Sequence, residues 1–196
     1  MKRLLPTLAL VFGAVGLPMQ ASAAPEVYDI DPEHTVAAFL IMHAGYAKVL
    51  GQFSDIEGEF TFDDETNEVT DITARIGAES VTTGHDGRDR HVRSADFLDA
   101  EAHPDITFTS TGGTAISETE GVISGDLTIR GVTNPVDLDV KLNLVAVYPC
   151  CHEKETIGVS ATTTFLRSDF GSTYALPVFV GDEVEVILEF EAIKRD

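Results

Sequence analysis

The densest group of chemically active side chains in this chain lies in one short segment, between residues 88 and 96. It holds three arginines, one histidine and two aspartates: Arg88, Asp89, Arg90, His91, Arg93 and Asp96. Cations are scarce elsewhere, because the whole chain has 13 Lys and Arg against 33 Asp and Glu. Guanidinium groups bind oxyanions through paired N–H donors. The segment therefore predicts either a site for the polar end of a ligand or a set of internal ion pairs.

Both interpretations of these cations stay open from the sequence. In the first, Arg88, His91 and Arg93 lie at the mouth of a cavity and hold a pyrophosphate, a carboxylate or a quinone carbonyl. In the second, Arg88 or Arg93 pairs with Asp96 or Asp169, because buried charges are tolerated mainly when they are paired. We favour internal pairing for Arg93 and keep both interpretations for Arg88 and His91.

The other histidines are isolated, and no catalytic motif is visible. His43 shares a strand face with Phe39 and Ile41, which favours a hydrogen-bonded core histidine, with a head-group contact as the alternative. His34 follows Asp31-Pro32, as is typical of a turn. The chain has no Gly-x-Ser-x-Gly elbow and no His-Glu-x-x-His zinc motif. We therefore expect no enzymatic activity and no cofactor, since a hydrolase built on the arginine-rich segment would lack an oxyanion device.

Cys150 and Cys151 are adjacent and are the only cysteines, so a disulfide framework is excluded. With His152 they offer three ligands for a soft metal. A closed tetrahedral site needs four, and no second Cys/His cluster is visible to complete it. A vicinal disulfide or pairing with another chain are further alternatives. The favoured interpretation is an exposed loop without metal, and a metal-binding or thiol-redox protein is the alternative function.

The first 23 residues have the pattern of a secretory signal peptide. Lys2 and Arg3 precede an apolar run from Leu4 to Leu17, and Ala21-Ser22-Ala23 provides the small residues of a cleavage site. The run is too short to span a bilayer, and no later segment is long and apolar enough. We therefore predict an exported, periplasmic chain without stable membrane insertion, with one domain over residues 24–196.

The formal net charge is −20, and the acidic residues are scattered along the chain. A surface of this sign repels phosphate backbones and anionic lipid head groups. Nucleic acid is therefore excluded as an expected partner.

Apolar and polar residues alternate with a period of two over most of the chain, which predicts β-strands. Turn residues separate the alternating segments at Asp63–Asn67, Gly112-Gly113 and Gly131–Pro135. Eight or nine strands with one apolar face each are typical of an antiparallel barrel or sandwich. The alternating segments are Val27–Ile30, Thr35–His43, Phe60–Phe62, Ile72–Ala78, Ile106–Phe108, Ile123–Ile129, Val136–Leu144, Val159–Phe165 and Val184–Phe190.

Two segments depart from this alternation, and the interior mixes large and small side chains. Ala44–Phe53 is expected to form a short helix or turn, and Ser94–Ala102 one or two helical turns. The chain has 11 Phe and no Trp, and several rings fall beside Ala37, Ala74 or Ala161 on inward faces. Such an interior suits a packed core or a cavity, and an eight-stranded closed barrel is wide enough for one small apolar ligand.

Three motifs occur in order along the chain: RDRHVRSADFLDAEAHPDITF (Arg88–Phe108), GDLTIRGVTNPVDL (Gly125–Leu138) and FLRSDFG (Phe165–Gly171). With these motifs the chain resembles the YceI-like family of secreted lipid- and polyisoprenoid-binding proteins. The resemblance extends from Tyr28 to about Ala192, and three ordered motifs over that length are a specific signal. The segment from Tyr148 to His152 is not among the family's motifs.

The resemblance implies an all-β fold, an extended, eight-stranded antiparallel, lipocalin-like barrel with a short helical segment. It also implies periplasmic transport, storage or presentation of an isoprenoid, another long-chain lipid or an isoprenoid quinone, without catalysis. The tail would lie in an apolar tunnel, where burial contributes about 0.8 kcal/mol per methylene. The predicted tunnel residues are Phe39, Ile41, Phe53, Phe60, Ile76, Phe97, Phe108, Leu127, Ile129, Phe165, Phe170, Tyr174 and Phe190. The predicted head-group residues are Arg88, His91, Arg93 and His43, and homodimer formation stays open.

Overall fold

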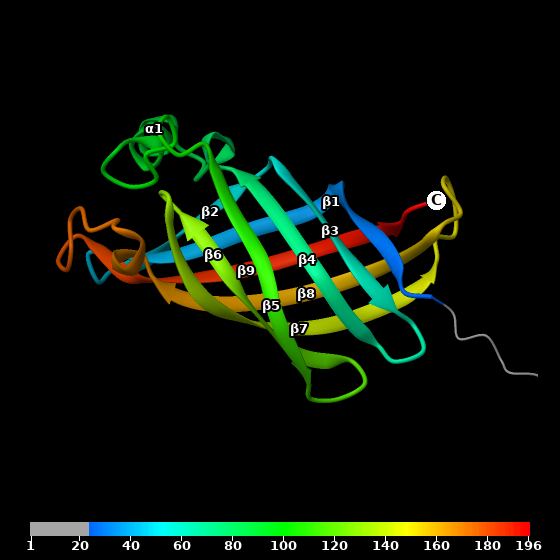
Figure 1. Cartoon of the computed structure of the whole chain (residues 1–196). Helices are drawn as coiled ribbons and strands as arrows, with labels where there is room; N and C mark the ends of the chain where they lie inside the picture. The colour runs from blue at the N-terminus through cyan, green and yellow to red at the C-terminus, as the bar shows by residue number, and fades with distance from the viewer. Residues whose placement is uncertain (1–23) are drawn as a thin grey trace, which may run out of the picture.

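Nine antiparallel strands form one sheet that closes on itself in the structure, a computed structural model that describes residues 24–196. The long strands β1, β7, β8 and β9 run the length of the molecule, and shorter strands complete the wall (Figure 1). The predicted signal peptide lies outside the described residues. The strands are β1 (Glu26–His43), β2 (Ala47–Phe53), β3 (Ile56–Asp63), β4 (Glu68–Gly77), β5 (Asp105–Ala115), β6 (Glu120–Ile129), β7 (Val132–Val147), β8 (Glu155–Leu166) and β9 (Val180–Lys194).

Strand β1 closes the barrel, because it pairs with β9 along one edge and with two strands along the other. On that second edge, Glu26–Asp29 pairs with β3 and Ala37–His43 pairs with β2. The closed ring therefore has eight strands, β1 and β3 to β9, and β2 lies beside one half of β1. This confirms the predicted eight-stranded antiparallel barrel. The two segments predicted at the start of the chain are the two halves of β1, separated by a register shift between Ile30 and Thr35.

The helical segment lies earlier in the sequence than expected. Helix α1 is Asp86–Arg93, and the predicted helical segment Ser94–Ala102 forms a series of turns instead. The α1 sequence places aspartates in its first turn and Arg90, His91 and Arg93 in its last, as the helix dipole favours. The turns after α1 include Asp99 at a φ of 51°, a left-handed conformation that a helix cannot continue through. Among the described residues, no helix is long and apolar enough to cross a membrane.

The expected helix or turn at Ala44–Phe53 is also corrected. Three residues, Ala44 to Tyr46, turn the chain between β1 and β2, with Ala44 at φ 48° and Gly45 at φ 75°. The rest of the segment is β2, held by seven residue pairs with β1 from Ala37↔Phe53 to His43↔Ala47. Pairing with β1 overrides the weak local pattern of this segment.

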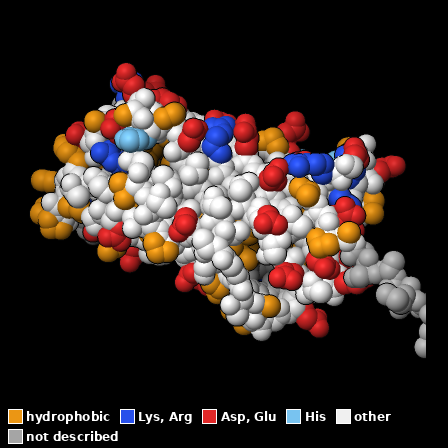
Figure 2. All heavy atoms as spheres, in the orientation of Figure 1, with side chains coloured by type: hydrophobic (Ala, Val, Ile, Leu, Met, Phe, Trp, Pro, Cys, Tyr) orange, Lys and Arg blue, Asp and Glu red, His pale blue; other side chains and the backbone are white. Residues whose placement is uncertain are grey.

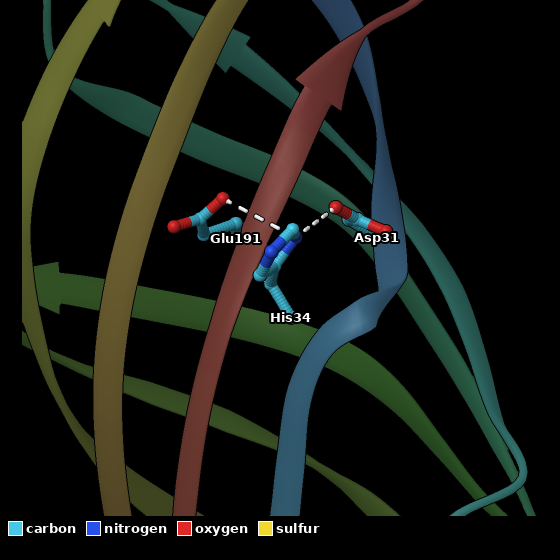
Figure 3. A group of neighbouring side chains, drawn as sticks. All are labelled: Asp31, His34 and Glu191. Atoms are coloured by element: carbon cyan, nitrogen blue, oxygen red, sulfur yellow. Dashed lines mark hydrogen bonds and ion pairs between the residues drawn. The ribbon is translucent and has the colours of Figure 1, made fainter. Parts of the chain in front are cut away.

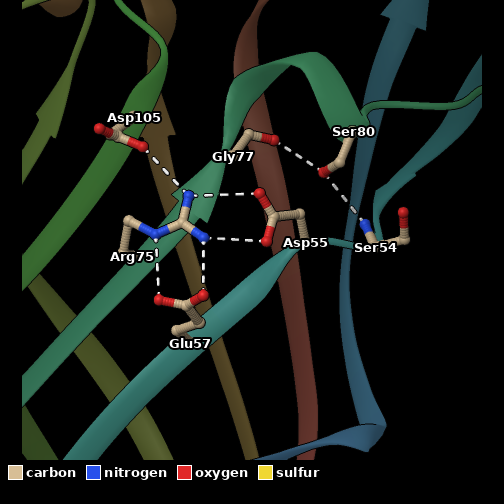
Figure 4. Close-up of polar contacts among 7 residues, drawn as sticks. All are labelled: Ser54, Asp55, Glu57, Arg75, Gly77, Ser80 and Asp105. Atoms are coloured by element: carbon tan, nitrogen blue, oxygen red, sulfur yellow. Dashed lines mark hydrogen bonds and ion pairs between the residues drawn. The ribbon is translucent and has the colours of Figure 1, made fainter.

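An ion-pair network joins neighbouring strands of the barrel close to the end of β4 (Figure 4). The Arg75 guanidinium on β4 lies 2.9 Å from Asp55 Oδ1, 3.2 Å from Glu57 Oε1 and 3.1 Å from Asp105 Oδ1, so it joins β3, β4, β5 and the β2–β3 turn. These three carboxylates, Asp55 first, raise the pKa of Arg75. The strand then leads into the short 3₁₀ helix η1 (Ala78–Ser80) and on to α1.

The interior does not pack into one continuous core. One buried cluster contains Tyr28, Phe60, Phe62, Ile157, Val159 and Ala192, and a second contains Ala78, Ala100, Ile106, Ile129 and Phe170. The second cluster includes Ala78 of η1, Ala100 of the turns after α1 and Phe170 of η2 (Arg167–Phe170). It therefore lies at the end of the barrel where these segments connect the strands. Inward side chains of both clusters border a cavity, so the alternative of a solid core is wrong.

Candidate functional site

A cavity of about 1400 Å³ occupies the lumen of the barrel. Drug-sized ligand pockets have volumes of roughly 300–1,000 Å³, so this cavity suits a larger ligand. At one end its wall includes α1 and the β8–β9 loop, and at the other it includes the β3–β4 and β5–β6 hairpins. Apolar side chains from every strand of the closed ring line it between these ends, and Ala37, Ala74 and Ala161 contribute small side chains to the wall.

Two glycines let aromatic rings lie flat against the wall. A Cβ at Gly51 would lie 2.2 Å from Cζ of Phe39, and a Cβ at Gly125 would lie 2.2 Å from Cζ of Phe108. Both distances are far below a van der Waals contact, so any other residue would displace the ring. The absence of a side chain at these positions therefore keeps the lumen open where two of the predicted tunnel rings line it.

All thirteen predicted tunnel residues line this cavity. Phe60, Ile129 and Phe170 are buried, and most of the others are half-buried. Inward rings that keep accessible surface face open space rather than close-packed neighbours. The structure therefore brings the thirteen side chains together around one lumen, and their contact with a ligand stays a prediction.

Three aromatic rings meet at the α1 end of the cavity. The ring centroids of His91, Phe97 and Tyr174 lie 5.0–5.4 Å apart in pairs, with edge-to-face geometry. The rings come from α1, from the turns after α1 and from the β8–β9 loop, and each lines the cavity. Edge-to-face aromatic pairs contribute about 0.5–1.5 kcal/mol beyond their buried area. This trio of rings forms the mouth of the cavity.

Arg167, in η2, is the buried cation at this mouth, and it was not among the predicted site residues. It is 6% exposed and lines the cavity, and its guanidinium carbon lies 5.6 Å from the Phe97 ring centroid. Burial lowers its pKa. The guanidinium donates to the carbonyl oxygens of Gly181 (2.8 Å), Ser172 (2.7 Å), Tyr174 (2.8 Å) and Val180 (3.2 Å).

Arg167 therefore holds the β8–β9 loop in place beside the cavity. The sequence feature that could have identified Arg167 as a site residue was its position in FLRSDFG, where an arginine follows an apolar alternating strand and precedes a glycine. That pattern does not show which carbonyl groups the side chain reaches, because they lie up to 14 residues further along the chain, in the β8–β9 loop and at the start of β9.

Three of the four predicted head-group residues reach the same end of the cavity. Arg88, His91 and His43 line it, and all three are exposed. The Arg88 side chain donates from Nε to Thr83 Oγ1 (2.7 Å) and from Nη2 to the Thr83 carbonyl (2.8 Å). Nε2 of His91 lies 2.9 Å from Asp96 Oδ2. The interpretation of His43 as a core histidine is wrong, because it is the last residue of β1 and is exposed.

Arg93 does not line the cavity. Its Nη2 donates to the Val81 carbonyl at 2.7 Å, and its Nε lies 3.8 Å from Glu79 Oε2. Arg93 therefore has the internal role that the sequence favoured, but with Glu79 and the Val81 carbonyl as its partners, and its prediction as a head-group residue is wrong. The predicted partners Asp96 and Asp169 are wrong for both Arg88 and Arg93. The reason is that α1 directs these side chains toward η1 and the segment from Val81 to Thr83 that follows it. The sequence pattern did not predict that this segment lies beside α1.

Asp89 anchors α1 on its buried side. Its carboxylate accepts hydrogen bonds from the Thr83 hydroxyl, from the Thr83 backbone N–H at 2.7 Å and from the Thr82 hydroxyl at 3.1 Å. These hydrogen bonds, the one from the Thr83 hydroxyl first, lower the pKa of Asp89. The carboxylate therefore holds the helix that carries Arg88 and His91 against the barrel.

Replacing Asp89 with asparagine is expected to destabilise the protein at neutral pH and to have less effect in acid. The folded-state pKa of Asp89 lies below the unfolded value of about 3.9. Its contribution is therefore complete above the unfolded value and is lost as the pH falls through the folded value. Urea unfolding of the protein and of Asp89→Asn, at pH 7 and at several pH values below 4, measures this difference.

Asp126→Asn is the matched control, because Asp126 is exposed on β6 and should give a small difference at every pH. An Asp89→Asn effect that stays constant, or grows, as the pH falls would contradict this role of the carboxylate.

The fold and the cavity together define a class of protein, an elongated antiparallel barrel with an apolar lumen and a polar mouth. A profile of the YceI-like domain matches residues 28–192. The chain belongs to this family, which confirms the resemblance drawn from the three motifs. The UPF0312 protein of Ectopseudomonas mendocina (strain ymp) is 36% identical over 187 residues, which cover 95% of this chain and 96% of that relative. UPF0312 protein PC1_2518 of Pectobacterium carotovorum subsp. carotovorum (strain PC1) is 37% identical over 175 residues, 89% of each chain.

Solved structures share the architecture. The Campylobacter jejuni YCEI protein matches with a TM-score of 0.69 and 32% identity, over 79% of this chain and 90% of that one. A polyisoprenoid binding domain from Saccharophagus degradans, implicated in plant cell wall breakdown, matches with a TM-score of 0.65 over 86% of this chain and 98% of that one. At 16% identity, this second match shows the fold alone.

Proposed function

We propose that this protein is a periplasmic carrier for an amphiphile with a long apolar tail, most favourably an isoprenoid quinone or another polyprenyl lipid, and that it is not an enzyme. The observation that carries the proposal is the continuous apolar cavity of about 1400 Å³ inside the barrel. Burial of each methylene contributes about 0.8 kcal/mol, so a long tail supplies affinity without specific polar contacts. The polyisoprenoid binding of the Saccharophagus degradans domain, which shares this fold, is consistent with such a ligand.

The chemistry of the mouth favours a head group of low charge. Arg167 donates its hydrogen bonds to carbonyl oxygen atoms of the protein. Arg88 donates from Nε and Nη2 to oxygen atoms of Thr83. His91 is engaged with Asp96. A pyrophosphate would need several cations that are free to turn toward it, whereas a quinone carbonyl needs a single donor. The acidic surface, with red side chains spread over the face in Figure 2, also disfavours a polyanion.

The mouth also offers an apolar approach to the cavity. Tyr46 is 92% exposed on the β1–β2 turn, and Val178 and Phe179 are 66% and 64% exposed on the β8–β9 loop. The two segments touch, since the Ala44 N–H donates to the Phe179 carbonyl at 2.8 Å, and Phe179 also lines the cavity. An apolar tail that enters here remains in contact with apolar side chains on its way into the lumen.

Mass spectrometry of an organic extract tests the proposal. Protein exported by a lipid-replete bacterial host is expected to release about one equivalent of a long-chain lipid, with an isoprenoid quinone as the leading class. Native mass spectrometry of the same sample reports the ligand mass and the number of chains together. An extract with no lipid above that of an unrelated exported protein, from a preparation that also fails to take up added quinone, would overturn the proposal.

A further inference from the structure

A group of three potential metal ligands lies where β1 runs beside β9, and none of the three lines the cavity (Figure 3). Strand β1 leaves its register with β9 between Ile30 and Thr35, and Asp31 and His34 lie in this interruption. Nδ1 of His34 lies 2.7 Å from Oδ2 of Asp31 and 3.8 Å from Oε2 of Glu191 on β9. The three ligand atoms all lie within 4.8 Å of one another. The side chains converge on one point although they come from opposite ends of the chain.

The charges in this group do not balance. The Asp31 side chain is only 14% exposed and that of Glu191 is 35% exposed. Among the described residues, the ion pairs of both carboxylates are with His34, which carries one positive charge at most. Two partly buried carboxylates with one imidazole between them would be neutralised by a divalent cation, since buried charges are tolerated when they are paired or bind a metal.

We propose that Asp31, His34 and Glu191 bind one divalent transition-metal ion of the Zn²⁺ type. This site is separate from the lipid cavity and does not depend on the proposed carrier function.

The ligand types select the class of metal. Zn²⁺ takes imidazole nitrogen and carboxylate oxygen at about 2.0–2.2 Å. Two such ligands at a tetrahedral ion lie about 3.3 Å apart, between the 2.7 Å and 3.8 Å separations of His34 from its two carboxylate neighbours. An imidazole ligand favours Zn²⁺ and similar ions over Ca²⁺ and Mg²⁺, which prefer sites made of oxygen atoms alone.

Isothermal titration of the untagged, reduced and metal-free protein with Zn²⁺ tests the site. We expect one Zn²⁺ per chain and no competition from millimolar Ca²⁺. His34→Gln and Glu191→Gln should each weaken binding by at least about tenfold, the loss typical even of residues that only support a ligand. The double variant Cys150→Ser with Cys151→Ser should keep this binding, and it removes the two exposed thiols from the measurement. His103→Gln is the matched control, because His103 lies beside Gly131 and outside the group.

Circular dichroism establishes that each variant is folded, and a Co²⁺ titration of the unchanged protein gives a second measurement. A Co²⁺ spectrum without a thiolate-to-metal band supports ligation by the imidazole and the two carboxylates. The absence of Zn²⁺ binding, or binding that His34→Gln and Glu191→Gln leave unchanged, would overturn the site. Zn²⁺ binding that disappears in the double cysteine variant would also overturn it, because the thiols would then hold the ion.

Discussion

Replacement of Ala161 by phenylalanine is expected to remove most of the bound lipid and to leave the barrel folded. Ala161 lies on β8, is 3% exposed and lines the cavity between Val140 and Leu188 of the neighbouring strands. A ring at this position occupies lumen that the tail would otherwise fill. If it displaces two or three methylenes, about 2 kcal/mol of burial is lost, which is roughly thirtyfold in affinity.

The same ring should cost less stability than it would in a close-packed core, because Ala161 borders the lumen although it is itself only 3% exposed. Overpacking of a close-packed core costs typically about 1–3 kcal/mol, which is the upper bound for this variant. The measurements are the amount of lipid extracted per chain, the affinity for an added quinone and the midpoint of urea unfolding. Reduced lipid binding in a protein that still unfolds cooperatively is the expected result.

Thr162→Phe is the matched control for this prediction. Thr162 is the next residue on β8 and is exposed, so the same ring lies on the outer face of the barrel and lipid binding should be unchanged. Ala74→Phe gives a second test on β4, which is opposite β8 around the closed ring. Lipid content that is equal in the unchanged protein and in both inward variants would show that the lumen is not the binding site.

Replacement of Arg167 by alanine is expected to cause the largest loss of stability of any single substitution considered for this protein. The guanidinium is 6% exposed and donates to carbonyl groups along the loop between η2 and β9. Its removal leaves those carbonyl groups without their donor, and each unsatisfied buried group costs about 1–3 kcal/mol. Because some of the carbonyl groups regain water, we expect a total loss of about 3–5 kcal/mol. The midpoint of thermal unfolding should fall by on the order of 10 °C.

Limited proteolysis distinguishes this role from a general loss of packing. Cleavage of Arg167→Ala should begin in the β8–β9 loop, since that loop loses the side chain that holds it. Arg167→Lys should recover only part of the stability, because an ammonium group cannot reproduce the planar set of N–H donors.

Arg75→Ala is the comparison for Arg167→Ala, because Arg75 forms more ion pairs but at the surface. Exposed ion pairs contribute about 0–1 kcal/mol each and are weakened by salt. Arg75→Ala should therefore cost less than Arg167→Ala, and less still at high salt. Equal losses for the two variants, or a loss below about 1 kcal/mol for Arg167→Ala, would contradict the account of Arg167.

The wall of the barrel and its lining could be predicted from the sequence because both follow from local alternation. Side chains of a strand point to opposite faces in turn, so residues two apart, such as Phe39 and Ile41 or Thr163 and Phe165, share a face wherever the strand is placed. The predicted tunnel residues line the cavity for this reason. The helix was misplaced because the eight residues of α1 include only one apolar side chain, Val92, and so have no apolar periodicity.

What the sequence determined by itself was the class of fold, the family and the inward faces, since these depend on spacing along the chain. The tertiary structure decided which distant residues meet. Closure through β1 places His34 beside Glu191, the turn of α1 directs Arg93 away from the cavity, and the β8–β9 loop brings its carbonyl groups to Arg167. The physical reason is that a strand fixes the direction of its side chains within two residues, whereas their partners depend on the register between strands and on loop conformation, neither of which is a local property.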